Sequence, residues 1–238
     1  MMFENPPGII PSLDVDIERA KEVLECICEL RKEIAAIKIG SILCWEVGLK
    51  NAVSELKKIC NFPIIFDAQK AGTDIPEIVR KQVEIAAKSG VDAFIAAPQG
   101  SGSATLAAFV EACFEHKITP IVVVEMTHPE CNSFLSKDAS DKILEKSIEL
   151  GVVNFVAPAN KPERLKILRN VAKKRRKEIK ILSPGVGPQG GGSDSAVKAG
   201  SDFIIIGRSI YQTIDSKKQV IQIYTLIKDA YSARENSI

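Results

Sequence analysis

Short apolar segments alternate with longer amphipathic segments along the chain. The short segments are rich in Ile, Val and Phe and almost continuously apolar, as expected of parallel strands that are buried on both faces. They cover residues 8–14, 35–40, 62–68, 92–97, 119–126, 153–158, 179–185 and 201–207. The longer segments have apolar residues three and four positions apart, as in Val23, Ile27 and Leu30, and this spacing predicts helices. They cover residues 17–33, 44–58, 75–88, 103–116, 139–149, 162–176, 193–198 and 216–232.

Eight strands that are each followed by a helix, in a chain of 238 residues, predict a (β/α)8 TIM barrel. A doubly wound open sheet would give the same alternation, but the even count of eight favours the closed barrel. No linker rich in Pro, Gly or Ser interrupts the pattern. We therefore expect one catalytic domain that spans residues 1–238.

Composition and charge disfavour some classes of binding partner and cellular location. The formal net charge is only +2, so the whole chain has no strong attraction to nucleic acid or to an acidic membrane. The sequence has no signal peptide and no apolar run long enough to span a bilayer. The six cysteines form no CxxC motif, which favours reduced thiols in a cytoplasmic protein.

Charged and polar residues stand where the predicted strands end. In a (β/α)8 barrel the carboxyl ends of all strands meet at one mouth, where active sites lie. The residues at these positions are Asp14, Lys38, Asp67, Lys70, Thr127, His128, Pro158, Ser183, Pro184, Gly207 and Arg208. Any one of them could be an ordinary solvated loop residue, but several charges at the same end of different strands indicate a site.

Two glycine-containing loops follow the last two predicted strands. One is SPGVGPQGGG, residues 183–192, which includes Gln189 and Gly190, and the other is GRS, residues 207–209. Glycines let backbone N–H groups point into one concavity, and the Arg208 guanidinium matches phosphate oxygens. Because this fold often binds phosphate after its seventh and eighth strands, these loops predict a phosphorylated ligand.

The loop SPGVGPQGGG, followed by DFIIIGRSIY at residues 202–211, closely resembles the carboxyl-terminal signature of the orotidine 5′-phosphate decarboxylase family. Shorter stretches support the resemblance: SLDVD at 12–16, IKIG at 37–40, VEMTHPE at 124–130 and VAPANKPERL at 156–165. The resemblance implies that Asp14 binds the ribose, that Lys38 belongs to the catalytic network and that Thr127 reads the pyrimidine. Pro158, Ser183, Gln189, Gly190, Gly207 and Arg208 are expected to complete the substrate site.

The segment after the third predicted strand departs from the family pattern. The family has Asp-x-Lys-x-x-Asp-Ile-Pro, whereas DAQKAGTDIP at 67–76 is two residues longer. Asp67 and Lys70 would face opposite sides of a regular strand, so we expect a bulge or turn at 68–72. The family usually has a Thr two positions after the Pro that contacts the ribose from the neighbouring subunit, and this chain has Ile78 at that position.

The resemblance implies decarboxylation of orotidine 5′-phosphate to uridine 5′-phosphate by a homodimer with shared active sites. Loss of CO2 leaves a carbanion at C6, and a lysine ammonium can stabilise this charge and protonate it. Lys70 is the expected donor, with Asp67, Asp74 and Lys38 holding it charged in an alternating array. No residues have metal-ligand spacing, and we expect neither a metal nor another cofactor.

Two other functions fit parts of the sequence. A sugar-phosphate decarboxylase or aldolase of the same superfamily, such as hexulose-phosphate synthase, would share the Asp and Lys residues but would require Mg2+. A non-catalytic barrel could have kept the phosphate loops and lost the catalytic geometry through the longer 67–74 segment.

Overall fold

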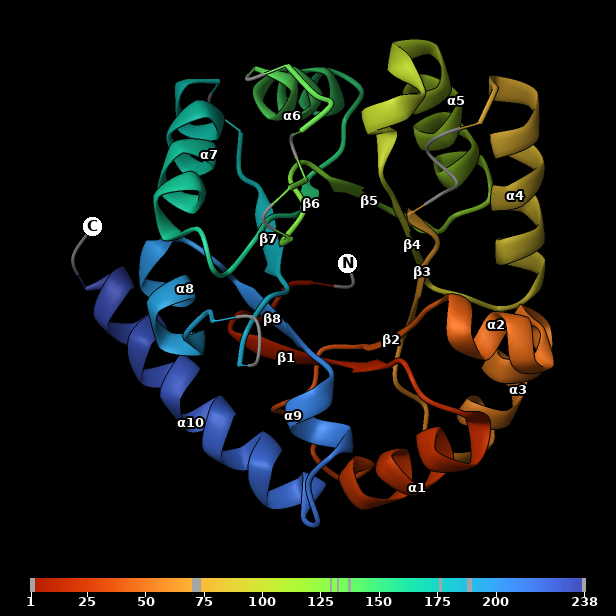
Figure 1. Ribbon diagram of the computed structural model, residues 1–238, viewed down its shortest axis with the longest axis vertical. Coiled ribbons are helices and arrows are strands. Elements are labelled where there is room, and N and C mark those ends of the chain that lie inside the picture. Colours follow the sequence, from red (N-terminus) through yellow and green to blue (C-terminus); the bar gives the residue numbers. More distant parts are fainter. Residues whose placement is uncertain are drawn as a thin grey trace.

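The computed structural model describes residues 3–69, 74–128, 130–131, 133–136, 138–175, 177–187 and 190–236. Its strands form the centre of the molecule and its helices form a ring around them (Figure 1). The strands are β1 (Gly8–Leu13), β2 (Ile37–Ile39), β3 (Ile64–Asp67), β4 (Ala93–Ala96), β5 (Thr119–Val123), β6 (Asn154–Val156), β7 (Lys180–Ser183) and β8 (Phe203–Ile206).

All neighbouring strands are parallel, and β1 pairs with both β2 and β8, which closes the barrel. The closing register aligns Ile9 with Ile204 and Ile10 with Ile205. The predicted (β/α)8 barrel is therefore confirmed, and the open-sheet alternative is wrong.

The helices of the outer ring are α1 (Ile17–Ile27), α2 (Ser41–Val47), α3 (Leu49–Ile59), α4 (Pro76–Lys88), α5 (Gly102–Glu115), α6 (Ala139–Glu149), α7 (Pro162–Lys174), α8 (Ser193–Ala199), α9 (Arg208–Tyr211) and α10 (Ser216–Glu235), with a short 3-10 turn at Pro98–Gly100. The helix predicted at 44–58 is divided because Gly48 adopts a φ of 79°, which ends one helix and starts the next. The short helix α9 was not predicted.

Two apolar layers stabilise the barrel. Side chains that point inward, including Ile10, Ile65, Ile95 and Ile205, form the barrel interior. Their neighbours in sequence point outward and pack with the helices in a second, larger cluster. This alternation explains why the strands are apolar on both faces.

One end of the barrel interior is closed by aromatic side chains. Phe3 precedes β1 and is buried against Phe203 at the start of β8, with 5.2 Å between the ring centroids. The coloured chain that leads into β1 accordingly runs across the centre of the ring of helices in Figure 1. A ligand must therefore enter from the opposite end, where the strands finish.

All six cysteines are free thiols. Burial raises the pKa of Cys44 and Cys60 to about 11 and raises the pKa of Cys113 further.

Among the described helices, none is long and apolar enough to cross a membrane.

Candidate active site

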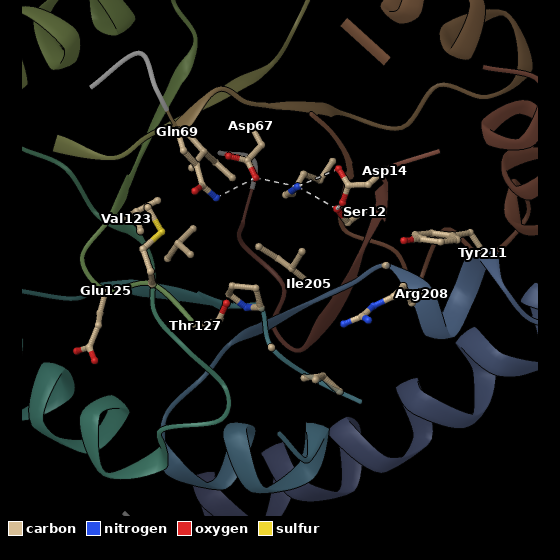
Figure 2. A pocket seen from close by; sticks show the side chains of 18 residues that line it. Ser12, Asp14, Asp67, Gln69, Val123, Glu125, Thr127, Ile205, Arg208 and Tyr211 are labelled. Atoms are coloured by element: carbon tan, nitrogen blue, oxygen red, sulfur yellow. Dashed lines mark hydrogen bonds and ion pairs between the residues drawn. The ribbon is translucent and has the colours of Figure 1, made fainter. Parts of the chain in front are cut away.

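A cavity of about 230 Å3 opens at the carboxyl ends of the strands. Figure 2 shows charged side chains from different strands pointing into it. The lining consists of Ser12, Asp14, Lys38, Asp67, Gln69, Ile95, Val123, Glu125, Met126, Thr127, Val156, Pro184, Gly185, Val186, Ile205, Gly207, Arg208 and Tyr211. The polar strand ends singled out in the sequence are thus largely brought together at one mouth.

Lys38 is the centre of the polar network. Its Nζ lies 2.8 Å from Asp67 Oδ2 and 3.9 Å from Asp14 Oδ1, and it donates a hydrogen bond of 2.9 Å to Ser12 Oγ. Ser12 Oγ in turn donates to Asp14 Oδ2 over 2.7 Å. These side chains come from the adjacent strands β1, β2 and β3, so strand pairing itself sets their spacing.

The environment of Lys38 keeps its ammonium charged. Burial alone would lower its pKa, but the carboxylates of Asp67 and Asp14 outweigh burial and raise it. The Asp67 side chain is only 7% exposed, so Lys38 is the ion-pair partner that compensates its burial. Asp67 Oδ1 is buried and has no hydrogen-bond partner in the described part of the chain, which leaves an acceptor free for a further donor.

The segment after β3 is described only up to Gln69 and again from Asp74. The expected proton donor, Lys70, lies outside the described residues, so its position stays a prediction. β3 ends at Asp67, as expected if the following residues do not continue a plain strand. Gln69, the last described residue before the gap, lines the cavity, and its Nε2 lies 3.4 Å from Asp67 Oδ2.

Asp74 is described but does not line this cavity. It precedes α4, and its Oδ1 accepts a hydrogen bond of 2.8 Å from the backbone N–H of Ile75. The buried Thr105 hydroxyl donates to the Asp74 carbonyl over 2.7 Å. Asp74 is therefore held at the entrance to α4 and is separate from the Asp14–Lys38–Asp67 cluster.

The predicted phosphate loops form the opposite side of the mouth. Pro184, Gly185, Gly207 and Arg208 all line the cavity. Figure 2 shows Arg208 across the cavity from Asp67, with Tyr211 beside it. Arg208 therefore lies on the opposite side of the mouth from Asp67, which is paired with Lys38.

Glycine is required at two positions of the loop after β7. Gly187 has a φ of 76°, and an added Cβ would lie 2.7 Å from Ser209 Oγ in the other loop. An added Cβ at Gly191 would lie 2.5 Å from the Gly185 carbonyl oxygen. The two loops are thus too close to each other for larger residues at these positions.

Three other residues expected in the substrate site do not line the cavity, and a fourth lies outside the described residues. Ser183 is fully buried and lies outside the cavity because it alternates with Leu182, whose side chain fills the barrel interior. Pro158 and Gly190 also do not line the cavity, and Gln189 lies outside the described residues.

Tyr211 is a lining residue that the sequence analysis missed. It lies on α9, the short helix that had no periodic signal. Burial and the Asp14 carboxylate raise its pKa, so the phenol remains protonated and can donate a hydrogen bond. Its position one helical turn after Arg208 could have indicated that both face the same loop.

Glu125 also lines the cavity, but its carboxylate is engaged elsewhere. It accepts hydrogen bonds of 2.8 Å from both Lys161 Nζ and Arg164 Nε, and Figure 2 shows it pointing away from the cavity centre. Asn160 donates to the neighbouring Thr127 carbonyl over 3.1 Å. The segment after β5 that carries Glu125 and Thr127 is therefore fixed against the loop after β6 and the start of α7.

The chemistry of the mouth is that of an anion site with a buried ammonium at its centre. Arg208 can bind a dianionic group at one side, while Lys38 and its carboxylates can stabilise a developing charge at the other. Across the described residues, no three His, Cys, Asp or Glu side chains are arranged to hold a metal ion.

Comparison with known proteins places this geometry in a family. The model of the "Orotidine 5'-phosphate decarboxylase / HUMPS family" matches residues 7–223. An orotidine 5′-phosphate decarboxylase of Thermococcus kodakarensis is 38% identical over 91% of this chain and 94% of its own length. The enzyme of the same name from Methanosarcina mazei is 36% identical over 89% of this chain and 91% of its own length.

Solved structures give the same result. The chain resembles the crystal structure of orotidine 5′-monophosphate decarboxylase from Methanocaldococcus jannaschii complexed with the inhibitor BMP, with a TM-score of 0.82, 30% identity and coverage of 94% of this chain and 99% of that one. It also resembles the orotidine 5′-phosphate decarboxylase of Pyrococcus horikoshii, with a TM-score of 0.78, 32% identity and coverage of 92% and 99%. The chain therefore belongs to the orotidine 5′-phosphate decarboxylase / HUMPS family.

Proposed function

We propose that this enzyme is a carboxy-lyase that converts orotidine 5′-phosphate to uridine 5′-phosphate and CO2, the step that completes UMP in pyrimidine biosynthesis. The single observation that carries the proposal is the cavity itself, in which the Asp14–Lys38–Asp67 cluster faces Arg208 across the barrel mouth. The relatives that carry this activity in their names match almost the whole chain.

The reaction breaks the bond between C6 and the carboxylate carbon, and the electron pair remains on C6 while CO2 leaves. A proton then passes from the Lys70 ammonium to C6, and solvent reprotonates the amine. Asp67 and Asp74 keep Lys70 charged and oriented, and Lys38 completes the charge array. The free acceptor Asp67 Oδ1 is suited to the Lys70 ammonium.

The binding residues hold the parts of the substrate that do not react. Arg208, Gln189 and the glycine loop bind the 5′-phosphate, Asp14 binds the ribose and Thr127 reads the pyrimidine. Gly207 lines the cavity and contributes backbone to the site, whereas Pro158, Ser183 and Gly190 do not line it and would act only by supporting its loops. Binding energy from the remote phosphate can then be used to orient C6 against the lysine. The reaction proposed here requires no metal or other cofactor.

We also propose that the working unit is a homodimer with shared active sites. Asp74 does not line the cavity of its own chain, as expected if its carboxylate acts in the neighbouring subunit. On α2, Trp45 is 84% exposed and Ile42 is 48% exposed, and Trp45 lines a second hollow together with Lys38 and Asp67. Large exposed apolar side chains beside an active site are suited to an interface.

Residues 1–238 would act as one domain, and the free thiols are compatible with a cytoplasmic location.

The test is loss of orotidine 5′-phosphate absorbance with purified protein, with and without EDTA. We expect turnover that EDTA does not reduce. Turnover that requires Mg2+ and a hexulose phosphate would instead support a sugar-phosphate lyase. Binding of uridine 5′-phosphate without any turnover would support a non-catalytic barrel.

A further inference from the structure

The lengthened segment between Asp67 and Asp74 is held at both ends by one neighbouring part of the chain. On the side of β3, the backbone N–H of Ala97 donates to the Gln69 carbonyl over 3.1 Å. On the side of α4, Thr105 Oγ1 donates to the Asp74 carbonyl over 2.7 Å. Ala97 follows β4 and Thr105 lies in the first turn of α5, so both supports come from the β4–α5 connection.

Of the two contacts, only the one from Thr105 is made by a side chain, so a substitution can remove it. Thr105 is 2% exposed, so its hydroxyl has no access to bulk water and the Asp74 carbonyl is its acceptor. Because α4 and α5 are neighbours in the outer ring (Figure 1), the bond joins the start of one helix to the start of the next. It therefore fixes the backbone at Asp74 relative to a helix that is anchored in the core.

This position matters for the direction of the Asp74 side chain. The Asp74 carboxylate accepts from the N–H of the next residue, Ile75, so it is restrained locally but not by any other described element. The direction in which the carboxylate projects is consequently set by the backbone that carries it. A shift of about 1 Å in a catalytic group can lower turnover by two orders of magnitude.

We propose that Thr105 is a positioning residue for the decarboxylation. Its hydroxyl fixes the carbonyl of Asp74 and thereby the end of the segment that contains Lys70 in sequence. This inference rests on the proposed function, in which Asp74 and Lys70 act at C6. It also gives a reason why a segment two residues longer than the family pattern can support the reaction, since both of its ends are fixed.

A buried threonine can also be present only for packing, and two substitutions separate the roles. Thr105→Val keeps the shape and removes the hydroxyl, whereas Thr105→Ser keeps the hydroxyl and removes the methyl group. A packing role predicts that Thr105→Ser is the more damaging change. A positioning role predicts that Thr105→Val lowers kcat more than Thr105→Ser does, because serine retains the hydroxyl.

The matched control is Ser147→Ala in α6. The Ser147 hydroxyl is also buried and donates to a backbone carbonyl, that of Ile143, over 2.7 Å. Its removal deletes the same kind of hydrogen bond at a place that does not touch the cavity. Each variant is first compared with wild type by urea unfolding to establish that it is folded.

The experiment measures kcat and KM for orotidine 5′-phosphate. For Thr105→Val we expect kcat to fall by about 10-fold or more with KM changed by less than about 3-fold, because the loss concerns the transition state. Thr105→Ser and Ser147→Ala should retain wild-type kcat. Wild-type kcat in Thr105→Val, or an equal loss in Thr105→Ser, would overturn the proposal.

A second measurement does not depend on activity. Amide hydrogen exchange over residues 75–79, at the start of α4, should be faster in Thr105→Val than in wild type and unchanged in Ser147→Ala. Unchanged exchange in Thr105→Val would contradict the structural role of the bond. If wild-type protein does not decarboxylate orotidine 5′-phosphate, the proposed function fails, while this measurement still tests the Thr105 contact.

Discussion

Lys38 has the most fully defined environment of any charged residue in the cavity. It is buried, and it contacts Asp67, Asp14 and Ser12 at once. Such a group contributes to stability only while its partners are charged, and removing one partner leaves an uncompensated buried charge. The catalytic cluster should therefore also affect folding.

Lys38→Met is expected to destabilise the protein by about 3–5 kcal/mol in urea unfolding at about pH 7, because Asp67 loses its buried partner. Adding Asp67→Asn to Lys38→Met should recover part of this loss. The control is Lys57→Met, which breaks a partly exposed ion pair of 3.1 Å with Asp92 and should cost about 0–1 kcal/mol. Equal effects of the two single substitutions would contradict this account.

The pH dependence follows from the direction of the Lys38 pKa. The folded-state pKa is raised above the ordinary value of 10.5, so the contribution of Lys38 is fully present below that value. It is lost only as the pH rises through the higher folded-state pKa. The stability difference between wild type and Lys38→Met should thus stay constant from about pH 7 to about pH 9.

Arg208→Ala should lower kcat/KM by about 2–4 kcal/mol of transition-state stabilisation, because a charge-assisted contact to phosphate is lost. Added guanidinium should restore part of the activity, since it can occupy the place of the missing side chain. Steady-state kinetics with and without guanidinium test this prediction. Wild-type kinetics in Arg208→Ala would remove Arg208 from the phosphate site.

Some residues of the cavity could be identified from the sequence and others could not. Asp14, Asp67 and Arg208 could be found because they follow apolar strands, and all strand ends of a barrel meet at one mouth. Ser183 was assigned to the site, but the period of two turns its side chain out of the barrel. Gln69 and Tyr211 were missed because they lie in a turn and in a very short helix, where periodicity gives no direction.

At the scale of elements, the turn from β2 into α2 controls the position of Asp14. Gly40 is the first residue after β2, and an added Cβ would lie 3.0 Å from Asp14 Oδ1. Its φ of −128° is accessible to any residue, so a side chain here would displace the carboxylate without backbone strain.

Gly40→Ala should therefore raise KM by about 10-fold while leaving stability almost unchanged, because it displaces a ribose contact worth about 1.4 kcal/mol. Gly48→Ala provides the opposite case. Gly48 has a φ of 79° and open space around it, so alanine there should cost about 1–2 kcal/mol of stability with little change in KM. Kinetics and urea unfolding of both variants test the contrast.

Sequence periodicity located most elements but not their interruptions. The helix predicted at 44–58 contains Gly48, whose positive φ divides it into α2 and α3. A glycine in a helical pattern is usually tolerated, so the sequence alone did not indicate a break. The segment from Asp67 to Asp74 was expected to leave the strand, and β3 does end at Asp67, but the hydrogen bond from Thr105 has no sequence signal.

In the whole molecule, the barrel was predictable because eight buried apolar strands, each followed by a helix, favour closure into one barrel. For the oligomeric state, the structure of one chain shows which surfaces a partner subunit could cover. Asp74 outside the cavity and the exposed side chain of Trp45 are the features that support a dimer.

A subunit-mixing experiment tests the shared active site. Lys70→Ala and Asp74→Ala proteins should each be nearly inactive as homodimers. After subunit exchange, about half of the dimers are mixed, and each mixed dimer contains one site with both residues intact, so activity should reappear. No recovery, with exchange confirmed by mass spectrometry, would show that each chain uses its own Asp74.

The most direct test of the account is the Lys70→Ala variant, measured for turnover of orotidine 5′-phosphate and for binding of uridine 5′-phosphate by calorimetry. The account predicts that turnover falls by about 1,000-fold or more, because the proton donor at C6 is lost. Binding of uridine 5′-phosphate should remain, since the expected phosphate and base contacts come from Arg208 on α9 and from Thr127 after β5. Near wild-type turnover in Lys70→Ala, together with loss of turnover in Lys38→Ala, would contradict the account and assign the proton transfer to Lys38.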